Sequence, residues 1–223
     1  TLLNALIWSR AAQFSVKARQ QQNGQPPLLH ADDLGLAEGV DSAIIDLARS
    51  GQLRGASLLV NGPSAADAMK AWRGLADPPP LTLHLCLTEG HGLPNCPDLP
   101  TGFGRLLLAS LLPWQRRRIA PQLRTVLQQQ ISRYRQLTGL HHIRLDGHQH
   151  IQLVPLVLDT VLDLAGAESI TWVRTTREPL PEGLSLRLWW RSLQTGGLLK
   201  WLILQLLSAL AIPRLRRAGL ATN

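Results

Sequence analysis

The sequence Leu28-Leu29-His30-Ala31-Asp32-Asp33 joins a short apolar run to two adjacent aspartates. Neighbouring side chains on an extended backbone point to opposite sides, and two adjacent carboxylates repel each other. Such a pair is expected at the end of a strand only where the carboxylates bind a metal ion or transfer a proton in a reaction. We therefore expect a strand at residues 28–31, with Asp32 and Asp33 at a functional site.

Two later segments also place histidine or carboxylate groups at or near the end of an apolar run. Residues 81–90 contain His84 and Glu89, and residues 145–150 contain His148. Oxygen and imidazole ligands gathered from the ends of several strands are typical of a divalent-metal site. Together with the two aspartates, these segments indicate a metal centre.

Short apolar runs alternate with helical patterns along the chain, which predicts an α/β fold with a parallel sheet or barrel. In such folds functional groups gather at the carboxyl ends of the strands. Asn61, Glu89 and Arg174 fall there and are predicted to bind substrate, although Asn61 could cap a turn and the other two could form ion pairs. The predicted strands are 28–31, 56–60, 81–87, 142–145 and 170–173, and the predicted helices are 37–49, 64–75, 121–137 and 153–164.

The third predicted strand alternates leucine with more polar residues, so His84 lies on the face opposite to the leucines. If the leucine face packs against helices, His84 points into the interior of a barrel. A lone histidine on a strand is more often a hydrogen-bonded core residue than a ligand, but its combination with Asp33 and His148 favours a ligand. Of the two histidines after the fourth strand, His148 is the preferred ligand and His150 the second choice.

The composition fits one folded domain, because 223 residues with 45% hydrophobic content can bury a sizeable core. The net charge of +8 lies largely in arginine runs at 116–118 and 214–217, without the aromatic residues that single-stranded nucleic acid requires, so a nucleic-acid function is disfavoured.

Residues 198–212 are rich in leucine, but Lys200 interrupts them and the remainder is too short for a transmembrane segment. We expect a buried or surface-docked helix there. Two cysteines without metal-type spacing favour a reducing compartment, and we expect a cytoplasmic protein.

Five segments, in order, resemble the YdjC-like carbohydrate deacetylases, a family that includes chitooligosaccharide deacetylases and the hopanoid-associated HpnK group. The resemblance runs from about Leu28 to Asn223 and rests on residues 31–36, 57–62, 83–90, 146–150 and 172–179. It implies an irregular (β/α) TIM-like barrel, a divalent cation such as Mg²⁺ or Zn²⁺, and hydrolysis of an N-acetyl group. Matched position by position, Asp33, His84 and His148 correspond to the metal ligands and Asp32 to the catalytic base.

The sequence departs from this family at both ends. Residues 1–27 form an N-terminal extension with no counterpart in the family. Residues 28–223 are expected to form the deacetylase-like barrel domain without its C-terminal portion, so the barrel is expected to be incomplete in this chain. In the family that portion carries a His-Pro-Gly motif whose histidine is a candidate acid. Within this chain, His150 is the nearby candidate.

The chemistry of these residues favours a metal-dependent hydrolase that removes an N-acetyl group from an amino sugar, an N-acetylated oligosaccharide or a glycolipid. One alternative is a catalytically inactive sugar- or metal-binding protein of the same fold. Another is a barrel with phosphoester or sugar-isomerase chemistry. That alternative would need a phosphate nest or a lysine near the site, and Lys17, Lys70 and Lys200 lie elsewhere in the sequence. The oligomeric state stays open, with a homodimer among the options.

Overall fold

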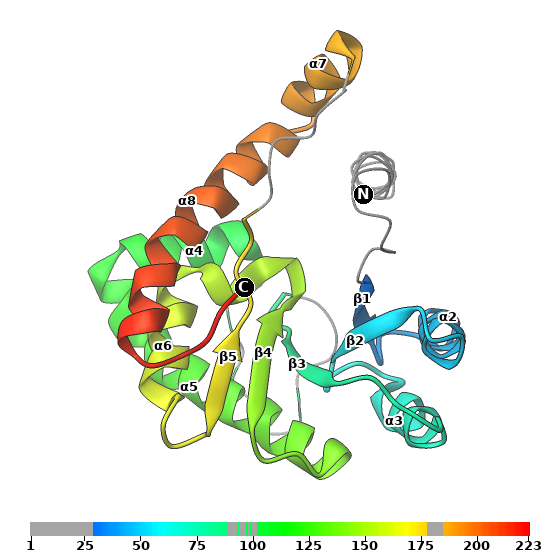
Figure 1. Ribbon diagram of the computed structural model, residues 1–223. Helices are drawn as coiled ribbons and strands as arrows, with labels where there is room; N and C mark the ends of the chain where they lie inside the picture. The colour runs from blue at the N-terminus through cyan, green and yellow to red at the C-terminus, as the bar shows by residue number, and fades with distance from the viewer. Residues whose placement is uncertain (1–28, 89–92, 94–96, 98, 100–101, 178–184) are drawn as a thin grey trace.

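The computed structural model describes residues 29–88, 93, 97, 99, 102–177 and 185–223 (Figure 1). Five parallel strands form one sheet in the sequential order β1-β2-β3-β4-β5. The strands are β1 (Leu29–Leu34), β2 (Leu53–Leu58), β3 (Leu81–Leu85), β4 (Ile143–Gly147) and β5 (Ile170–Val173). This confirms the predicted parallel α/β fold. Sequential parallel strands are the arrangement of a (β/α) barrel wall. Among the described residues, β1 and β5 do not pair with each other, so the wall is open.

Helices connect the strands and extend beyond the last one. They are α2 (Glu38–Arg49), α3 (Ala65–Arg73), α4 (Phe103–Leu111), α5 (Pro113–Thr138), α6 (Pro155–Leu164), α7 (Leu186–Gln194) and α8 (Gly197–Arg217), with a 3₁₀ segment, η1 (His148–Leu153), directly after β4. The predicted helices at 37–49, 64–75 and 153–164 are therefore confirmed. The leucine-rich segment at 198–212 forms most of α8, as expected of a helix that docks on the surface.

Several boundaries differ from those predicted; β2, for example, spans Leu53–Leu58 and not residues 56–60. Strand β1 does not end at Ala31 but continues to Leu34, because Leu34 is fully buried and pairs with Leu58 of β2. Asp32 and Asp33 are consequently part of the strand. Helix α5 begins at Pro113, eight residues before the predicted start at Pro121. Proline at the first position is compatible with a helix start, and a proline inside a helix removes only one backbone donor.

The chain returns to the free edge of β5 after α8. The Ala221 N–H donates to the Thr171 carbonyl at 3.0 Å, and the Val173 N–H donates to the Ala221 carbonyl at 3.0 Å. Further along, the Thr175 N–H donates to the Asn223 side-chain oxygen at 2.8 Å. These bonds hold the end of α8 and the residues after β5 in place beside the carboxyl end of the sheet.

Candidate active site

Three of the predicted site residues meet at the carboxyl end of the sheet. Asp33 comes from β1, His84 from β3, and His148 from the first position after β4. Asp33 Oδ1 lies 2.8 Å from His148 Nδ1 and 3.1 Å from His84 Nε2. One ligand atom from each residue lies within 4.8 Å of the others, a separation that allows all three to share one metal ion.

The backbone at this cluster is unusual. Asp33, Gln149 and His150 have positive φ angles of 67°, 56° and 61°, a region that residues other than glycine rarely adopt. The left-handed conformation at Asp33 interrupts the regular pairing of β1 with β2. At Gly147, just before His148, a Cβ atom would stand 2.6 Å from the Gln152 side-chain oxygen, so that any other residue would displace this side chain. These local conformations turn the chain sharply on both sides of the cluster.

A buried carboxylate that the sequence reasoning did not assign supports the cluster. Asp146 is fully buried in β4 and is the register partner of His84 in β3. Its Oδ1 accepts a hydrogen bond from His84 Nδ1 at 2.6 Å, and its Oδ2 accepts one from the Ser57 hydroxyl at 2.5 Å. Because the proton on Nδ1 points to Asp146, the Nε2 atom of His84 faces Asp33. A carboxylate behind a ligating histidine is a common device that fixes the ring and its tautomer.

Charges within the cluster shift the pKa values of its members. Burial acts to lower the pKa of His84, but hydrogen bonds with Asp146 and Asp33 outweigh it and raise the pKa to about 9. Burial acts to raise the pKa of Asp33, but hydrogen bonds with His148 and His84 hold it well below its usual value. A cation that binds His84 Nε2 must displace the proton from that atom, so cation affinity should fall as the pH falls below about 9.

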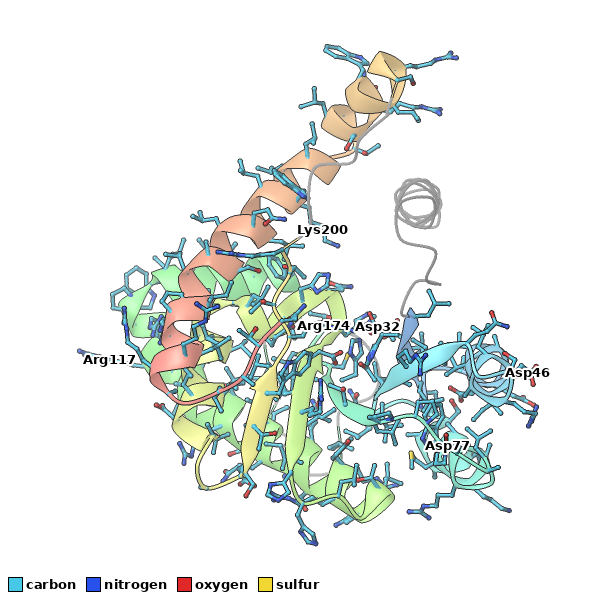
Figure 2. All side chains as sticks on the ribbon, in the orientation of Figure 1. Asp32, Asp46, Asp77, Arg117, Arg174 and Lys200 are labelled. Carbon is cyan, nitrogen blue, oxygen red and sulfur yellow. The ribbon has the colours of Figure 1, made fainter. Side chains whose placement is uncertain are left out.

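Asp32 lies beside this cluster and points to a different partner. Arg174, directly after β5, donates from its NH1 atom to Asp32 Oδ1 at 2.7 Å and lies 3.1 Å from Asp146 Oδ2 (Figure 2). His30 Nε2 lies 2.7 Å from the Ser57 hydroxyl and 3.8 Å from Asp32 Oδ1. His30, Asp32 and Asp146 form a second group with ligand atoms close enough to hold an ion. Arg174 supplies positive charge to this group, which disfavours a second cation there.

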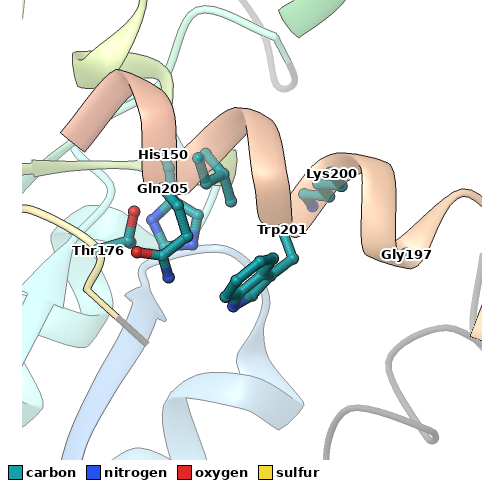
Figure 3. A pocket seen from close by; sticks show the side chains of 7 residues that line it. His150, Thr176, Gly197, Lys200, Trp201 and Gln205 are labelled. Atoms are coloured by element: carbon teal, nitrogen blue, oxygen red, sulfur yellow. The ribbon is translucent and has the colours of Figure 1, made fainter. Parts of the chain in front are cut away.

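His150 lines a pocket of about 210 Å³ between η1 and α8 (Figure 3). The other lining residues are Thr176, Gly197, Lys200, Trp201, Leu204 and Gln205. Burial, followed by the positive charge of Lys200, lowers the pKa of His150 to about 4. Lys200, which is distant from His150 in the sequence, is thus one of the residues that line this pocket. Helix α8 packs against η1, and its first half places this lysine at the pocket.

The predicted substrate-binding residues have different positions. Asn61 lies after β2, and its side-chain oxygen is buried without a hydrogen-bond partner in the structure. Arg174 forms the two ion pairs described above, the alternative that the sequence reasoning left open. Glu89 lies outside the described residues.

Three residues of the site, Asp146, Ser57 and His30, were not predicted from the sequence, because their sequence patterns are only weak indicators. Asp146 stands in an apolar strand in register with His84, and a buried acid at that place requires a partner. Ser57 and His30 have no distinctive spacing, because both act through contacts between strands that are distant in the sequence. Only the strand pairing reveals them.

We expect Asp146→Asn to weaken divalent-metal binding by about 10- to 100-fold, the usual cost of losing a carboxylate that supports a ligating histidine. The reason is that the amide no longer holds the Nδ1 proton with a negative charge. Isothermal titration with Zn²⁺ or Mg²⁺ measures the effect, with Asp77→Asn, an exposed aspartate, as the matched control. Unchanged affinity in Asp146→Asn would contradict this supporting role.

The fold and the site define a parallel α/β protein with an Asp-His-His cluster at the carboxyl ends of its strands. A family model described as YdjC-like protein matches residues 28–223. The chain belongs to the YdjC-like protein family, which confirms the resemblance that its motifs indicated.

Two relatives are carbohydrate deacetylases. The mouse protein is 32% identical over 174 residues, covering 71% of this chain and 52% of its own length. The human protein is 31% identical over 174 residues, covering 71% of this chain and 50% of its own length. The chain thus spans about half the length of the curated relatives that it matches.

A solved structure supports the fold. An Enterococcus faecalis V583 protein, a candidate cellobiose-phosphate cleavage protein, superposes with a TM-score of 0.51 at 21% identity. The superposition covers 69% of this chain and 59% of that protein.

Proposed function

We propose that this chain carries the site of a metal-dependent carbohydrate deacetylase, which removes an N-acetyl group from an amino sugar, an N-acetylated oligosaccharide or a glycolipid. The observation that carries the proposal is the geometry of Asp33, His84 and His148, whose ligand atoms lie within 4.8 Å of one another. Asp32 stands beside them, available for proton transfer. The carbohydrate deacetylases among the relatives support the class of substrate.

The donor set fits a divalent cation. One carboxylate and two imidazoles, with Asp146 behind His84, match the ligands of catalytic Zn²⁺ sites, and Mg²⁺ is the alternative for a site with fewer protein ligands. When bound, such a cation would polarise the acetyl carbonyl and favour ionisation of an attacking water.

The residues of the chain then have separate roles. We assign Asp32 as the base that takes a proton from the attacking water, because its side chain is partly exposed and is paired with Arg174 and not with the ligand cluster. Arg174 holds the Asp32 carboxylate in one position at 2.7 Å. Hydrolysis of the amide gives acetate and an amine, and the nitrogen must gain a proton as the C–N bond breaks.

His150 is our candidate for that proton transfer. With a pKa of about 4 it is neutral at pH 7, so it can hydrogen-bond to the substrate as it stands. Action as an acid requires that its pKa rise in the complex with substrate, and the negative charge that develops on the carbonyl oxygen favours such a rise. As imidazolium, His150 would give its proton to the nitrogen as the C–N bond breaks, and the proton that Asp32 takes from the attacking water would balance this loss.

The pocket beside His150 is our proposed location for the sugar. Trp201 offers an aromatic surface, and Gln205, Thr176 and Lys200 offer polar groups, a combination that suits a sugar ring with one apolar face. Asn61, after β2 and not among the lining residues of this pocket, has a buried side-chain oxygen without a hydrogen-bond partner among the described residues. We keep Asn61, Glu89 and Arg174 as substrate-binding residues in this proposal, with Arg174 acting through Asp32.

One observation favours a second candidate, a protein that binds metal or sugar without turnover. Arg174 occupies Asp32 Oδ1 at 2.7 Å, the group that must accept a proton. If the ion pair persists in the complex with substrate, Asp32 Oδ1 stays engaged with Arg174 and does not take the proton from water.

Acetate release from N-acetylated chitooligosaccharides distinguishes the two candidates. We expect the protein to release acetate. The rate of release should fall to the buffer background after treatment with a chelator and recover with added Zn²⁺ or Mg²⁺, because the carbonyl is not polarised without the cation. An enzymatic assay for acetate provides the measurement, with a fully deacetylated oligosaccharide as the control. Tight metal binding without acetate release from any N-acetylated sugar would favour the binding protein.

A further inference from the structure

Helix α8 is apolar on two opposite faces. One face is buried against α6 and η1 through residues such as Leu204, Leu207 and Leu215. Four other leucines remain between 57% and 62% exposed, at positions 199, 202, 206 and 210. At 3.6 residues per turn they fall within roughly 80° of one another and extend for roughly 17 Å along the helix. We call these four residues the leucine stripe.

Helix α7 continues the apolar surface beyond the start of α8. Trp190 is 64% exposed and Leu193 is 57% exposed, and Arg187 and Arg191 are exposed on the same short helix. Figure 1 shows that α7 and the first half of α8 project away from the sheet as an arm. The leucine stripe and the Trp190 side chain are therefore exposed in the part of the chain that the structure describes.

The charge of the arm is entirely positive. Residues 185–217 contain no aspartate or glutamate. The basic residues of this segment are Arg187, Arg191, Lys200, Arg214, Arg216 and Arg217, of which Arg214 pairs with Asp159 of α6. Exposed leucine and tryptophan beside arginine, with no acid, is the pattern of a helix that lies on an anionic membrane surface. Two copies of the arm would repel each other.

The arm fits the surface of a membrane better than its interior. Within the described residues, α8 is the one helix long and apolar enough to cross a bilayer, and 28% of its apolar stretch is buried in the protein. Because that buried face packs on α6 and η1, α8 cannot be surrounded by lipid without leaving the fold. It can lie in the interface with the leucine stripe facing the acyl chains.

We propose that the α7–α8 arm docks on an anionic lipid surface. The leucine stripe and Trp190 enter the boundary between headgroups and acyl chains, and Arg187 and Arg191 contact lipid phosphates. Lys200 and Trp201 of the same arm line the pocket beside His150, so docking places this pocket close to the membrane. The proposal does not depend on the reaction that the site catalyses.

Sedimentation with vesicles tests the proposal on the whole chain. We expect the protein to sediment with vesicles of phosphatidylcholine and phosphatidylglycerol and much less with phosphatidylcholine alone. The double variant Leu202→Gln/Leu206→Gln should lower the partition coefficient at least about 10-fold, because two exposed leucines no longer enter the apolar layer. Arg187→Gln/Arg191→Gln should lower partition onto the anionic vesicles by roughly 5-fold per arginine.

Matched variants away from the arm serve as controls. Leu140→Gln replaces an exposed leucine just after the end of α5, and Arg54→Gln/Arg124→Gln replaces two exposed arginines on β2 and α5. These variants should sediment like the wild type. Equal sedimentation of the Leu202→Gln/Leu206→Gln variant and the wild type would overturn the proposal. The proposal would also be overturned if the wild type did not bind lipid and formed a dimer that the Leu202→Gln/Leu206→Gln variant converts to a monomer. The leucine stripe would then bind a second copy of this chain.

Tryptophan fluorescence gives a measurement that does not depend on the folding of the leucine variants. Brominated lipids in anionic vesicles should quench part of the wild-type emission, and Trp190→Phe should lose that part. An absence of quenching in the wild type would show that the arm does not enter the lipid.

Discussion

Replacing Asp32 with asparagine should leave the metal bound and lower turnover by about 10²- to 10⁴-fold, the share that a positioned acid or base contributes. Asparagine has nearly the same shape and can still contact Arg174, but it cannot accept a proton from water. Acetate release under saturating substrate measures turnover, and titration with Zn²⁺ or Mg²⁺ measures metal binding on the same samples. An effect on turnover without an effect on metal affinity is the signature of a base.

Asp77→Asn is the matched control for this substitution, since it makes the same chemical change at an exposed position distant from the sheet end (Figure 2). It should have wild-type turnover and metal affinity. If Asp32→Asn instead loses metal as completely as a ligand variant, then Asp32 is itself a ligand. The division of roles between Asp32 and Asp33 would then be wrong.

Alanine at Asp33 or His84 should abolish both metal binding and acetate release. Each substitution removes one of three ligand atoms, a larger loss than the 10- to 100-fold cost of a supporting residue. His84→Ala also leaves Asp146 buried with one partner fewer, so its thermal unfolding must be measured beside its metal affinity. His84→Gln retains most of the volume and separates the loss of a ligand from the loss of packing.

His142→Ala is the control for the histidine variants, because His142 is exposed just before the opposite end of β4. It should bind metal and release acetate like the wild type. Metal binding that survives in Asp33→Ala and His84→Ala would show that the ion sits elsewhere. The group of His30, Asp32 and Asp146 would be the first place to look.

The sequence predicted the parts of the fold that depend on local patterns. The alternation of leucines around His84 located a buried strand, and the acids and histidines at strand ends identified the residues that the structure brings together. Both inferences rest on backbone geometry that any chain must obey.

The parts that the sequence did not predict depend on contacts between distant residues. Asp146 supports His84 only because β3 and β4 pair in one particular register. Lys200 reaches the pocket of His150 because α8 packs back on η1, which no spacing along the chain indicates. Strand β1 extends past its predicted end because the buried Leu34 pairs with Leu58 of β2, across the interruption at Asp33, and only the pairing of the two strands reveals this.

The contact between Asp33 and His148 joins residues 115 positions apart in the sequence. A cation held by both would act as a reversible cross-link between the first strand and the turn after the fourth. Such a link restricts the unfolded chain, and the entropy that it removes grows with the logarithm of the loop that it closes. The same ion that serves catalysis would then also add to the stability of the fold, so that removal of the metal should lower the temperature of unfolding as well as the activity.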